Sequence, residues 1–370
     1  MDGRAKSIDE LRERAADNDA EAQFQLAACC FSGVGMPVDP VEGVVWCKRA
    51  AENGLARAQF SLGACYFNAT GLPKNDREAV RWWLRAAEQG DADAQYNLGV
   101  CFENGLGAAR DPREAFFWWQ KAALQGHPRG QFSLGLCHKN GVGTRPNEAE
   151  AAKWWQKAAE QGNADAQFNL SACYYSGLGV TRDEKASVEW CRKAAMQGHI
   201  RAQFSLGVSY FNGVGIAKDA REAFAWWAKA AEQGHARAQF SLGMCYRKGA
   251  GIGRDDAEAV KWWRKAAEQA NAKAQLKLAG CYAAGTGVAR DSKEALYWYR
   301  KAGERGNAEA QYQTGLAYWN GFGQPKDDKE AVNWWRLAAE RGHVEAQHRL
   351  GECCFNGTGL PKDFVSAYQW

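Results

Sequence analysis

The sequence of 370 residues has no apolar run near the ~20 residues that a membrane-spanning helix needs, which argues against an integral membrane protein. It also has no excess of one charge, because 47 basic and 43 acidic side chains are interleaved and leave a formal net charge of +4. That balance gives no electrostatic footprint for nucleic acid. The segment Met1–Gln23 is too charged for the apolar centre of a secretory signal. We therefore expect a cytoplasmic protein with neither a nucleic acid nor a membrane as partner.

Common catalytic and metal-binding motifs are missing as well. The sequence contains no Cys-x-x-Cys, no His-Glu-x-x-His and no Ser-x-x-Lys segment. Such spacings place thiols, zinc ligands or a serine nucleophile where their chemistry needs them. We therefore expect no catalytic residues, no bound metal and no cofactor, and we predict that the protein is not an enzyme.

What the sequence has in abundance is repetition. A glutamine recurs every 36 residues from Gln23 to Gln347, without an insertion or deletion, and marks ten copies of one unit. A period of this length is typical of solenoids, in which each unit buries its apolar face against its neighbours. Most of the 17 tryptophans and 40 glycines, the compositional outliers, belong to columns of this repeat.

Each unit is predicted to hold two helices. In the third unit the first helix is expected over Ala92–Asn104, because Gly105 can take the left-handed conformation that ends a helix. The second helix would begin after Asp111, whose carboxylate can accept the free amides of the first turn, and Glu114 would complete a capping box. Nothing in the unit favours a strand. The predicted fold class is therefore all-α, with ten 36-residue helix-turn-helix repeats.

Large and small side chains recur at fixed places in the predicted core. Leu98 and Trp118 supply bulk, and the column of Trp118 is tryptophan in all ten units. Gly99 and the pair Ala122–Ala123 would let helix backbones approach closely. One helix pair cannot bury a tryptophan, so we interpret these tryptophans as the core of a continuous stack of repeats.

The order of these columns resembles that of a known family. Leu-Gly on the first helix, a Gly-x-Gly turn, an Asp or Asn cap followed by Glu, a Trp, and Lys-Ala-Ala-Glu-Gln-Gly before Ala-x-Ala-Gln are similar to the Sel-1-like repeat, a relative of the tetratricopeptide repeat. The resemblance covers nearly the whole chain. It implies a right-handed α/α superhelical solenoid whose first helices line the concave side. It also implies an adaptor or scaffold in multiprotein complexes, with no chemistry of its own.

The ends of the solenoid are expected to differ from its middle. We predict a single solenoid over residues 1–370, in which residues 1–19 form a partial helix as N-terminal cap and residues 20–370 form ten repeats, the last truncated at Trp370. An uncapped end exposes the apolar face meant for the next unit. We therefore expect the C-terminal end to be frayed, covered by a second copy through self-association, or continued in a longer natural chain.

The cysteines are predicted to be free thiols. Eight of the twelve share one first-helix column, namely Cys29, Cys65, Cys101, Cys137, Cys173, Cys245, Cys281 and Cys353. Neighbouring helices in a stack lie about 8–10 Å apart, beyond the ~7 Å Cα limit of a disulfide, and this favours a reducing cytoplasm. Cysteine-rich bacterial relatives staple a second helix to the next first helix near the positions of Ala86–Ala87 and Ala94–Gln95, where this chain has no cysteine. Cys47 could meet Cys29, and Cys191 could meet Cys173, within one repeat. Because eight of the ten repeats carry the first-helix cysteine anyway, we interpret these pairs as coincidence.

Four histidines stand immediately before a first helix, in a column that also holds Asp91 and Asn163. They are His127, His199, His235 and His343. They lie one to three repeats apart with no second ligand beside them, so we interpret them as exposed helix starts rather than metal ligands.

The candidate binding surface lies on the first helices. The positions of Asp93, Tyr96, Val100, Glu103 and Asn104 are three, four or seven residues apart and share one face, which tetratricopeptide relatives present to their ligands. The column of Glu103 varies most, so the fold demands no one residue type there, and we interpret its large aromatic side chains as anchors for a partner. The candidate partner-binding residues are Phe31, Phe67, Glu103, Lys139, Tyr175, Phe211, Arg247 and Trp319.

These observations predict a non-enzymatic adaptor or scaffold whose concave groove holds a peptide or an amphipathic helix of a partner protein. One alternative is small-molecule binding or hydrolase activity in the groove, which would need a convergent nucleophile and base. A second is a self-assembling structural solenoid. A third is an RNA-reading helical array, which the near-neutral charge disfavours.

Overall fold

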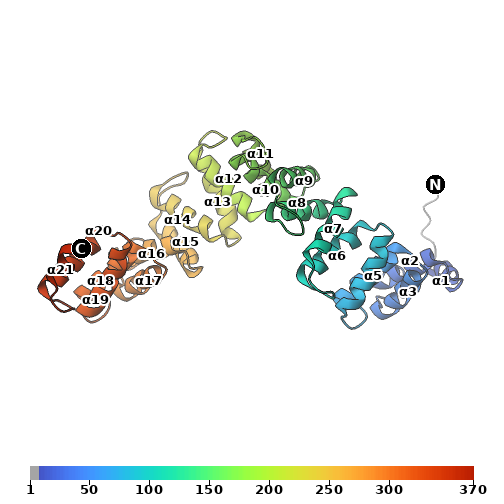
Figure 1. Ribbon diagram of the computed structural model, residues 1–370, viewed down its shortest axis with the longest axis horizontal. Helices are drawn as coiled ribbons and strands as arrows, with labels where there is room; N and C mark the ends of the chain where they lie inside the picture. Colours follow the sequence, from blue (N-terminus) through green and yellow to red (C-terminus); the bar gives the residue numbers. More distant parts are fainter. Residues whose placement is uncertain (1–7) are drawn as a thin grey trace. The chain divides into compact units, whose positions relative to one another are not determined.

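The computed structural model describes residues 8–370, and these residues form 21 α-helices and no strand. The helix α1 (Ile8–Ala16) precedes ten helix pairs (Figure 1). The first helices are α2 (Ala20–Ser32), α4 (Ala56–Asn68), α6 (Ala92–Asn104), α8 (Pro128–Asn140), α10 (Ala164–Ser176), α12 (Ile200–Asn212), α14 (Ala236–Lys248), α16 (Ala272–Ala284), α18 (Ala308–Asn320) and α20 (Val344–Asn356). The second helices are α3 (Pro40–Glu52), α5 (Asp76–Glu88), α7 (Pro112–Leu124), α9 (Glu148–Glu160), α11 (Glu184–Met196), α13 (Ala220–Glu232), α15 (Asp256–Glu268), α17 (Ser292–Glu304), α19 (Asp328–Glu340) and α21 (Phe364–Gln369).

The chain divides into two compact units, Met1–Asp183 and Glu184–Trp370. Within each unit, consecutive helices pack against one another in chain order, which is the arrangement of an α solenoid. The predicted all-α class and the 36-residue helix-turn-helix repeat are confirmed. The N-terminal cap was predicted over residues 1–19, of which residues 1–7 lie outside the described residues. Residues 8–16 form α1, which packs Leu11 and Ala15 against α2, and Asp19 is the N-cap of α2.

Two glycines shape the turn between the helices of a repeat. Gly105 has a φ of 71°, and its N–H donates to the Cys101 carbonyl oxygen, so it ends α6 in the left-handed conformation that the sequence predicted. Gly107 has a φ of 69°, and a Cβ on it would lie 2.1 Å from the carbonyl oxygen of Asp76 in the preceding repeat. The second glycine therefore lets each turn touch the start of the previous second helix.

The second helices begin at the predicted caps, but the capping box is not formed. The Asp111 carboxylate accepts the N–H groups of Arg113 and Glu114 at 2.9 and 3.2 Å. The N–H of Asp111 itself donates to the Phe102 carbonyl oxygen at 2.9 Å, so it has no need of the Glu114 carboxylate. Equivalent bonds from the cap to the first helix recur in all ten repeats. The expectation of a reciprocal box is therefore wrong: the cap N–H ties the two helices of a repeat together instead.

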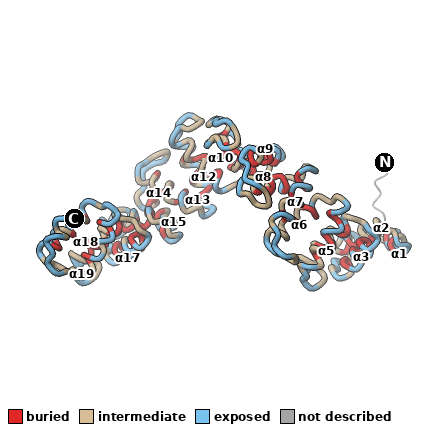
Figure 2. Tube along the Cα trace, viewed as in Figure 1, coloured by how far each residue is buried: buried red, intermediate tan, exposed pale blue. Residues whose placement is uncertain are grey.

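Within each unit, the core lies between consecutive helices (Figure 2). Leu98 is fully buried, but the column of Trp118 is core only in part. Trp118 is buried against Trp83 of the preceding repeat, whereas Trp46 is only half-buried and Trp370 is 39% exposed. The solvent-facing side of such a ring packs only against a basic side chain of the next helical turn. For example, Arg49 Cζ lies 4.5 Å from the centroid of the Trp46 ring.

A second set of buried indoles stands one position after the column of Trp118. Each of them donates its Nε1–H to a first-helix carbonyl oxygen 23 residues earlier, at 3.1 to 3.3 Å. They are Trp83, Trp119, Trp155, Trp227, Trp263 and Trp335. Each ring lies on a glycine of the first helix, where a Cβ would come within 2.4 to 2.6 Å of it. These glycines are Gly63, Gly99, Gly135, Gly207, Gly243 and Gly315.

The glutamines that mark the repeat are buried and join neighbouring helices. Gln95 Nε2 donates to the Ala87 carbonyl oxygen at 3.1 Å, and Gln95 Oε1 accepts from Gln125 Nε2 at 2.8 Å. The second bond is missing at Gln275 and Gln311, whose Oε1 atoms are buried without a hydrogen-bond partner. The positions that correspond to Gln125 hold Arg305 and Arg341 in those repeats.

Candidate functional site

The candidate residues occupy the last turns of the first helices, and three of the aromatic ones lean on a second helix. The rings of Phe67, Phe211 and Trp319 lie 5.3 to 5.4 Å, centroid to centroid, from Trp83, Trp227 and Trp335, respectively. Phe211 is nevertheless 39% exposed. Part of each of these three rings therefore packs on an indole of the second helix, while Ala283 at the same position of the eighth repeat shows that the fold demands no one residue type there.

The other two aromatic members differ in exposure. Phe31 is half-buried against α3, where a Cβ added to Gly43 would lie 2.8 Å from the ring. Tyr175 is 54% exposed, and Arg182 lies 5.9 Å from its ring centroid. In the same column Phe355, which the candidate set omits, is 58% exposed. Aromatic surface in this column therefore remains open at Tyr175, Phe211 and Phe355.

The charged members of the column have partners within the chain. Arg110 Nη2 donates to Glu103 Oε1 at 3.1 Å, and Arg247 Nη1 donates to Asp256 Oδ1 at 2.7 Å. Hydrogen bonds from Arg254 and Arg247 lower the pKa of Asp256 to about 2. Lys139 is exposed, and its Nζ lies 5.6 Å from the centroid of the Trp155 ring. The column thus places aromatic, acidic or basic groups at equivalent points without changing the helix.

The histidines before the first helices are N-caps, a role that the sequence analysis described only as a helix start. His127 Nδ1 accepts the N–H of Gly130 at 3.0 Å, and His235 Nδ1 accepts that of Ala238 at 3.2 Å. They are half-buried, whereas exposed helix starts were predicted. The ring of His235, for example, packs on the previous repeat, with its centroid 4.7 Å from that of Phe204. Burial and the nearby charges of Arg237 and Arg201 lower the pKa of His235.

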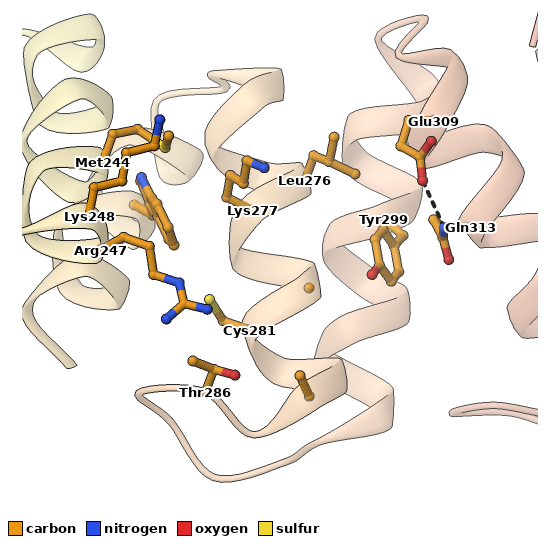
Figure 3. Close-up of a pocket in the computed structure, with 13 residues that line it drawn as sticks. Met244, Arg247, Lys248, Leu276, Lys277, Cys281, Thr286, Tyr299, Glu309 and Gln313 are labelled. Carbon is orange, nitrogen blue, oxygen red and sulfur yellow. Dashed lines mark hydrogen bonds between the residues drawn. The ribbon is translucent and has the colours of Figure 1, made fainter. Parts of the chain in front are cut away.

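A pocket of about 540 Å³ opens across α14, α16 and α18 (Figure 3). It lies where the eighth repeat has small side chains at two positions that are larger in several other repeats. Gly280 stands where Val100, Leu136 and Leu316 stand elsewhere, and Ala283 takes the place of Glu103. A Cβ on Gly280 would meet no atom closer than Tyr299 Oη, at 3.9 Å. Sequence reasoning missed this pocket, although the glycine among larger residues marked it.

The titratable groups of the pocket do not form a catalytic set. Burial raises the pKa of the Cys281 thiol, whereas a nucleophilic cysteine needs a lowered one. Burial, and next the charge of Glu309, raise the pKa of Tyr299. Burial by itself would raise the pKa of Glu309, but hydrogen bonds from Gln313 and His343 lower it. The pocket is therefore lined by polar and apolar side chains, and its thiol has a raised rather than a lowered pKa.

All twelve cysteines are free thiols, and eleven of them are buried. Burial raises the pKa of Cys101 and of Cys137 to about 12. Between residues 8 and 370, no three His, Cys, Asp or Glu side chains gather as a metal site would require. Over the same residues, no helix is both long enough and apolar enough to span a membrane.

Comparison with known proteins agrees with this architecture. The model of one protein family, the Sel1 repeat, matches residues 20–55, 56–91, 92–127, 128–163, 164–199, 200–235, 236–271, 272–307, 308–343 and 344–370. A comparison with curated proteins found no match.

Two solved structures are similar over most of the chain. One is c5321, a protective antigen of uropathogenic Escherichia coli strains that displays an SLR fold, with 34% identity over 99% of this chain and 86% of that one and a TM-score of 0.76. The other is a Sel1 repeat protein from Oxalobacter formigenes, with 34% identity over 85% of this chain and 91% of that one and a TM-score of 0.65. Because the family model matches ten consecutive segments and two solved structures are similar over most of the chain, this chain belongs to the Sel1 repeat family.

Proposed function

We propose that this protein is a cytoplasmic, non-enzymatic adaptor or scaffold that binds a peptide or an amphipathic helix of a partner protein on its first-helix face. Sel1-repeat proteins generally mediate protein–protein interactions, and the family is typically non-enzymatic. The partner-binding set is the candidate set named above, from Phe31 to Trp319.

The observation that carries this proposal is the open aromatic surface of one variable column. Tyr175 and Phe211 are 54% and 39% exposed, at a position where other repeats hold Glu103, Lys139 or Arg247. Exposed aromatic side chains cost solubility and are enriched at the energetic centres of interfaces. The fold does not require an aromatic residue at this position, so the exposed aromatic side chains there are suited to anchor a partner.

The experiment replaces aromatic anchors by glutamate rather than by alanine. Glu103 shows that a carboxylate fits this column when a basic residue stands seven positions later, as Arg110 does. Phe67 and Phe211 have Lys74 and Lys218 at that distance, so the variant F67E/F211E can form the same ion pair and keep its fold. We expect capture of a protein partner from native lysate to fall at least about tenfold, since loss of one anchor costs more than ~1.4 kcal/mol.

The matched control makes the same change on the second helices. Phe117 and Tyr297 are 43% and 49% exposed on α7 and α17. The variant F117E/Y297E should retain the partner. If both variants capture the same proteins as the unmodified chain, while circular dichroism shows both to be folded, the first-helix face is not the binding surface.

A second interaction, self-association, is favoured by apolar exposure near the last helix. Phe364, Val365 and Tyr368 are 62%, 70% and 94% exposed. Such side chains can bury themselves against a second copy. Light scattering over a concentration series should show a rising mean mass, and V365K/Y368K should abolish the rise. A constant monomer mass for the unmodified chain would contradict this contact.

A further inference from the structure

Charge follows a different rule on the first helices of the two units. At the position of Asp93, the sign alternates from repeat to repeat in the first unit, as Glu21, Arg57, Asp93, Arg129 and Asp165. In the second unit the same position is basic three times in succession, as Arg201, Arg237 and Lys273, before it becomes acidic at Glu309 and Glu345.

The helices that carry this run have no acidic residue at all. Together α12, α14 and α16 hold six basic side chains and no Asp or Glu, and we call these six the basic face: Arg201, Arg237, Arg247, Lys248, Lys273 and Lys277. The near-neutral charge of the whole chain hides this face.

The chain leaves most of the basic face without a partner of its own. In the first unit, alternation allows neighbours to pair, and Arg57 forms an ion pair with Glu21. On the basic face Arg247 binds Asp256, but within residues 8–370 the other five make no hydrogen bond or ion pair through their side chains. Two acidic groups lie beside it: Asp256, which Arg247 and Arg254 already bind, and Glu309 at the edge, whose pKa the charge of Lys277 helps to lower.

The pocket, which has both polar and apolar walls, lies within the basic face. Arg247 and Lys248 reach the pocket from α14 and Lys277 reaches it from α16, while Glu309 stands across it on α18 (Figure 3). Its apolar wall includes Met244, and its floor is open at Gly280. The pocket can therefore accept one aliphatic or aromatic side chain between basic groups.

We propose that the basic face binds an acidic peptide segment of the partner protein, with one apolar side chain of that segment seated at Gly280. This inference rests on the proposed function and specifies the chemistry of its partner. Carboxylates would neutralise a run of like charge that the fold itself leaves uncompensated. A peptide fits better than a nucleic acid, because Glu309, Glu345 and Glu352 on α18 and α20 would repel a phosphate backbone that continued past the basic face.

The experiment selects a random peptide library displayed on phage against the full chain, then measures the leading synthetic peptide by fluorescence anisotropy. We expect the selected sequences to be acidic with one recurring aliphatic or aromatic residue. The charge reversal K273E/K277E should weaken the leading peptide at least about tenfold and reduce the salt dependence of its affinity. Gly280→Leu should weaken it similarly while keeping or raising the Tm, because leucine stands at this position in other repeats and favours a helix over glycine.

The matched control R221E/R300E makes an equal charge change at exposed arginines on α13 and α17 and should bind within about twofold of the unmodified chain. Selected peptides that are neutral or basic, or that ignore K273E/K277E and Gly280→Leu, overturn this inference. If those peptides are still lost in F67E/F211E, the proposed function stands. Failure to select any peptide contradicts both. Tighter binding of a single-stranded oligoadenylate RNA, lost in K273E/K277E, would replace the acidic peptide by a nucleic acid.

Discussion

Replacing Gly243 by alanine should destabilise the protein, although glycine-to-alanine changes inside helices usually stabilise. Helix propensity alone favours alanine over glycine by about 0.8–1 kcal/mol. At Gly243, however, the added Cβ would lie 2.5 Å from Cδ1 and Nε1 of Trp263 and 3.0 Å from the Ala259 carbonyl oxygen. The indole cannot simply move away, because its Nε1–H donates to the Phe240 carbonyl oxygen at 3.2 Å and its ring is 2% exposed.

The size of the effect follows from these two constraints. Overpacking a close-packed core costs about 1–3 kcal/mol. Loss of the indole hydrogen bond in a buried place adds about 1–3 kcal/mol if the ring is displaced. After the propensity gain of about 1 kcal/mol is subtracted, we expect Gly243→Ala to lower the free energy of unfolding by about 1–5 kcal/mol, toward the upper end if the indole hydrogen bond is lost.

The protein supplies its own control and its own rescue. Gly280→Ala lies on the next first helix, where the Cβ meets nothing within 3.9 Å, and should raise stability by about 0.5–1 kcal/mol. The eighth repeat pairs Ala279 with Tyr299 where the seventh pairs Gly243 with Trp263. The double variant G243A/W263Y should therefore lose less stability than the sum of its single changes, with a coupling energy above about 0.5 kcal/mol.

Hydrogen exchange of the α14 and α15 amides is the suitable assay, because repeat arrays can unfold in parts and a single global midpoint would mix them. Faster exchange in Gly243→Ala and slower exchange in Gly280→Ala are expected. If both variants slow exchange equally, the indole does not constrain the glycine and our reasoning is refuted.

Three further predictions concern the other repeated contacts. Burial and nearby arginines lower the pKa of His235, so on acidification the unfolded chain takes up a proton at this residue before the folded chain does. Stability is therefore lost as the pH falls below about 6.5, the ordinary pKa of histidine. His235→Asn should remove this part of the loss, as melting curves at several pH values can show. Arg305→Gln should give the orphaned Gln275 Oε1 a donor and raise the local free energy of unfolding by about 1 kcal/mol, seen as slower hydrogen exchange of the α16 and α17 amides, whereas unchanged exchange would contradict the glutamine pairing. Cys101, with its pKa of about 12, should resist alkylation in the native state while half-buried Cys29 reacts first, as mass spectrometry can show.

The local features of this fold were predictable because they depend on neighbours in sequence. Gly105 ends α6 and Asp111 caps α7, since a left-handed glycine and a capping carboxylate act within a few residues of themselves. The capping box was predicted wrongly because the competing acceptor, the Phe102 carbonyl oxygen, lies nine residues earlier and belongs to another helix. Capping rules contain no information about that helix.

The candidate site was predictable in place but not in exposure. Helical spacing puts the column of Glu103 on one face, and the structure keeps it there. How far each side chain is buried depends on the second helix, because Phe67 and Trp319 lean on an indole whose position only the packed repeat defines. The contact between first-helix glycine and second-helix indole is visible in the sequence as a paired change. Six repeats combine a glycine with a tryptophan, whereas the eighth repeat combines Ala279 with Tyr299.

The charge of the first helices shows why an average over the whole chain can mislead. A net charge of +4 spread over ten repeats excludes a protein covered by basic residues, but it does not exclude a local run. In a solenoid each repeat presents equivalent positions, so the sign at one column from repeat to repeat describes the surface better than the total does. By that measure Arg201, Arg237 and Lys273 form an interruption in an alternating series. Because Arg237 has a basic residue on both sides at this column, we propose the interruption as the place where an acidic partner binds.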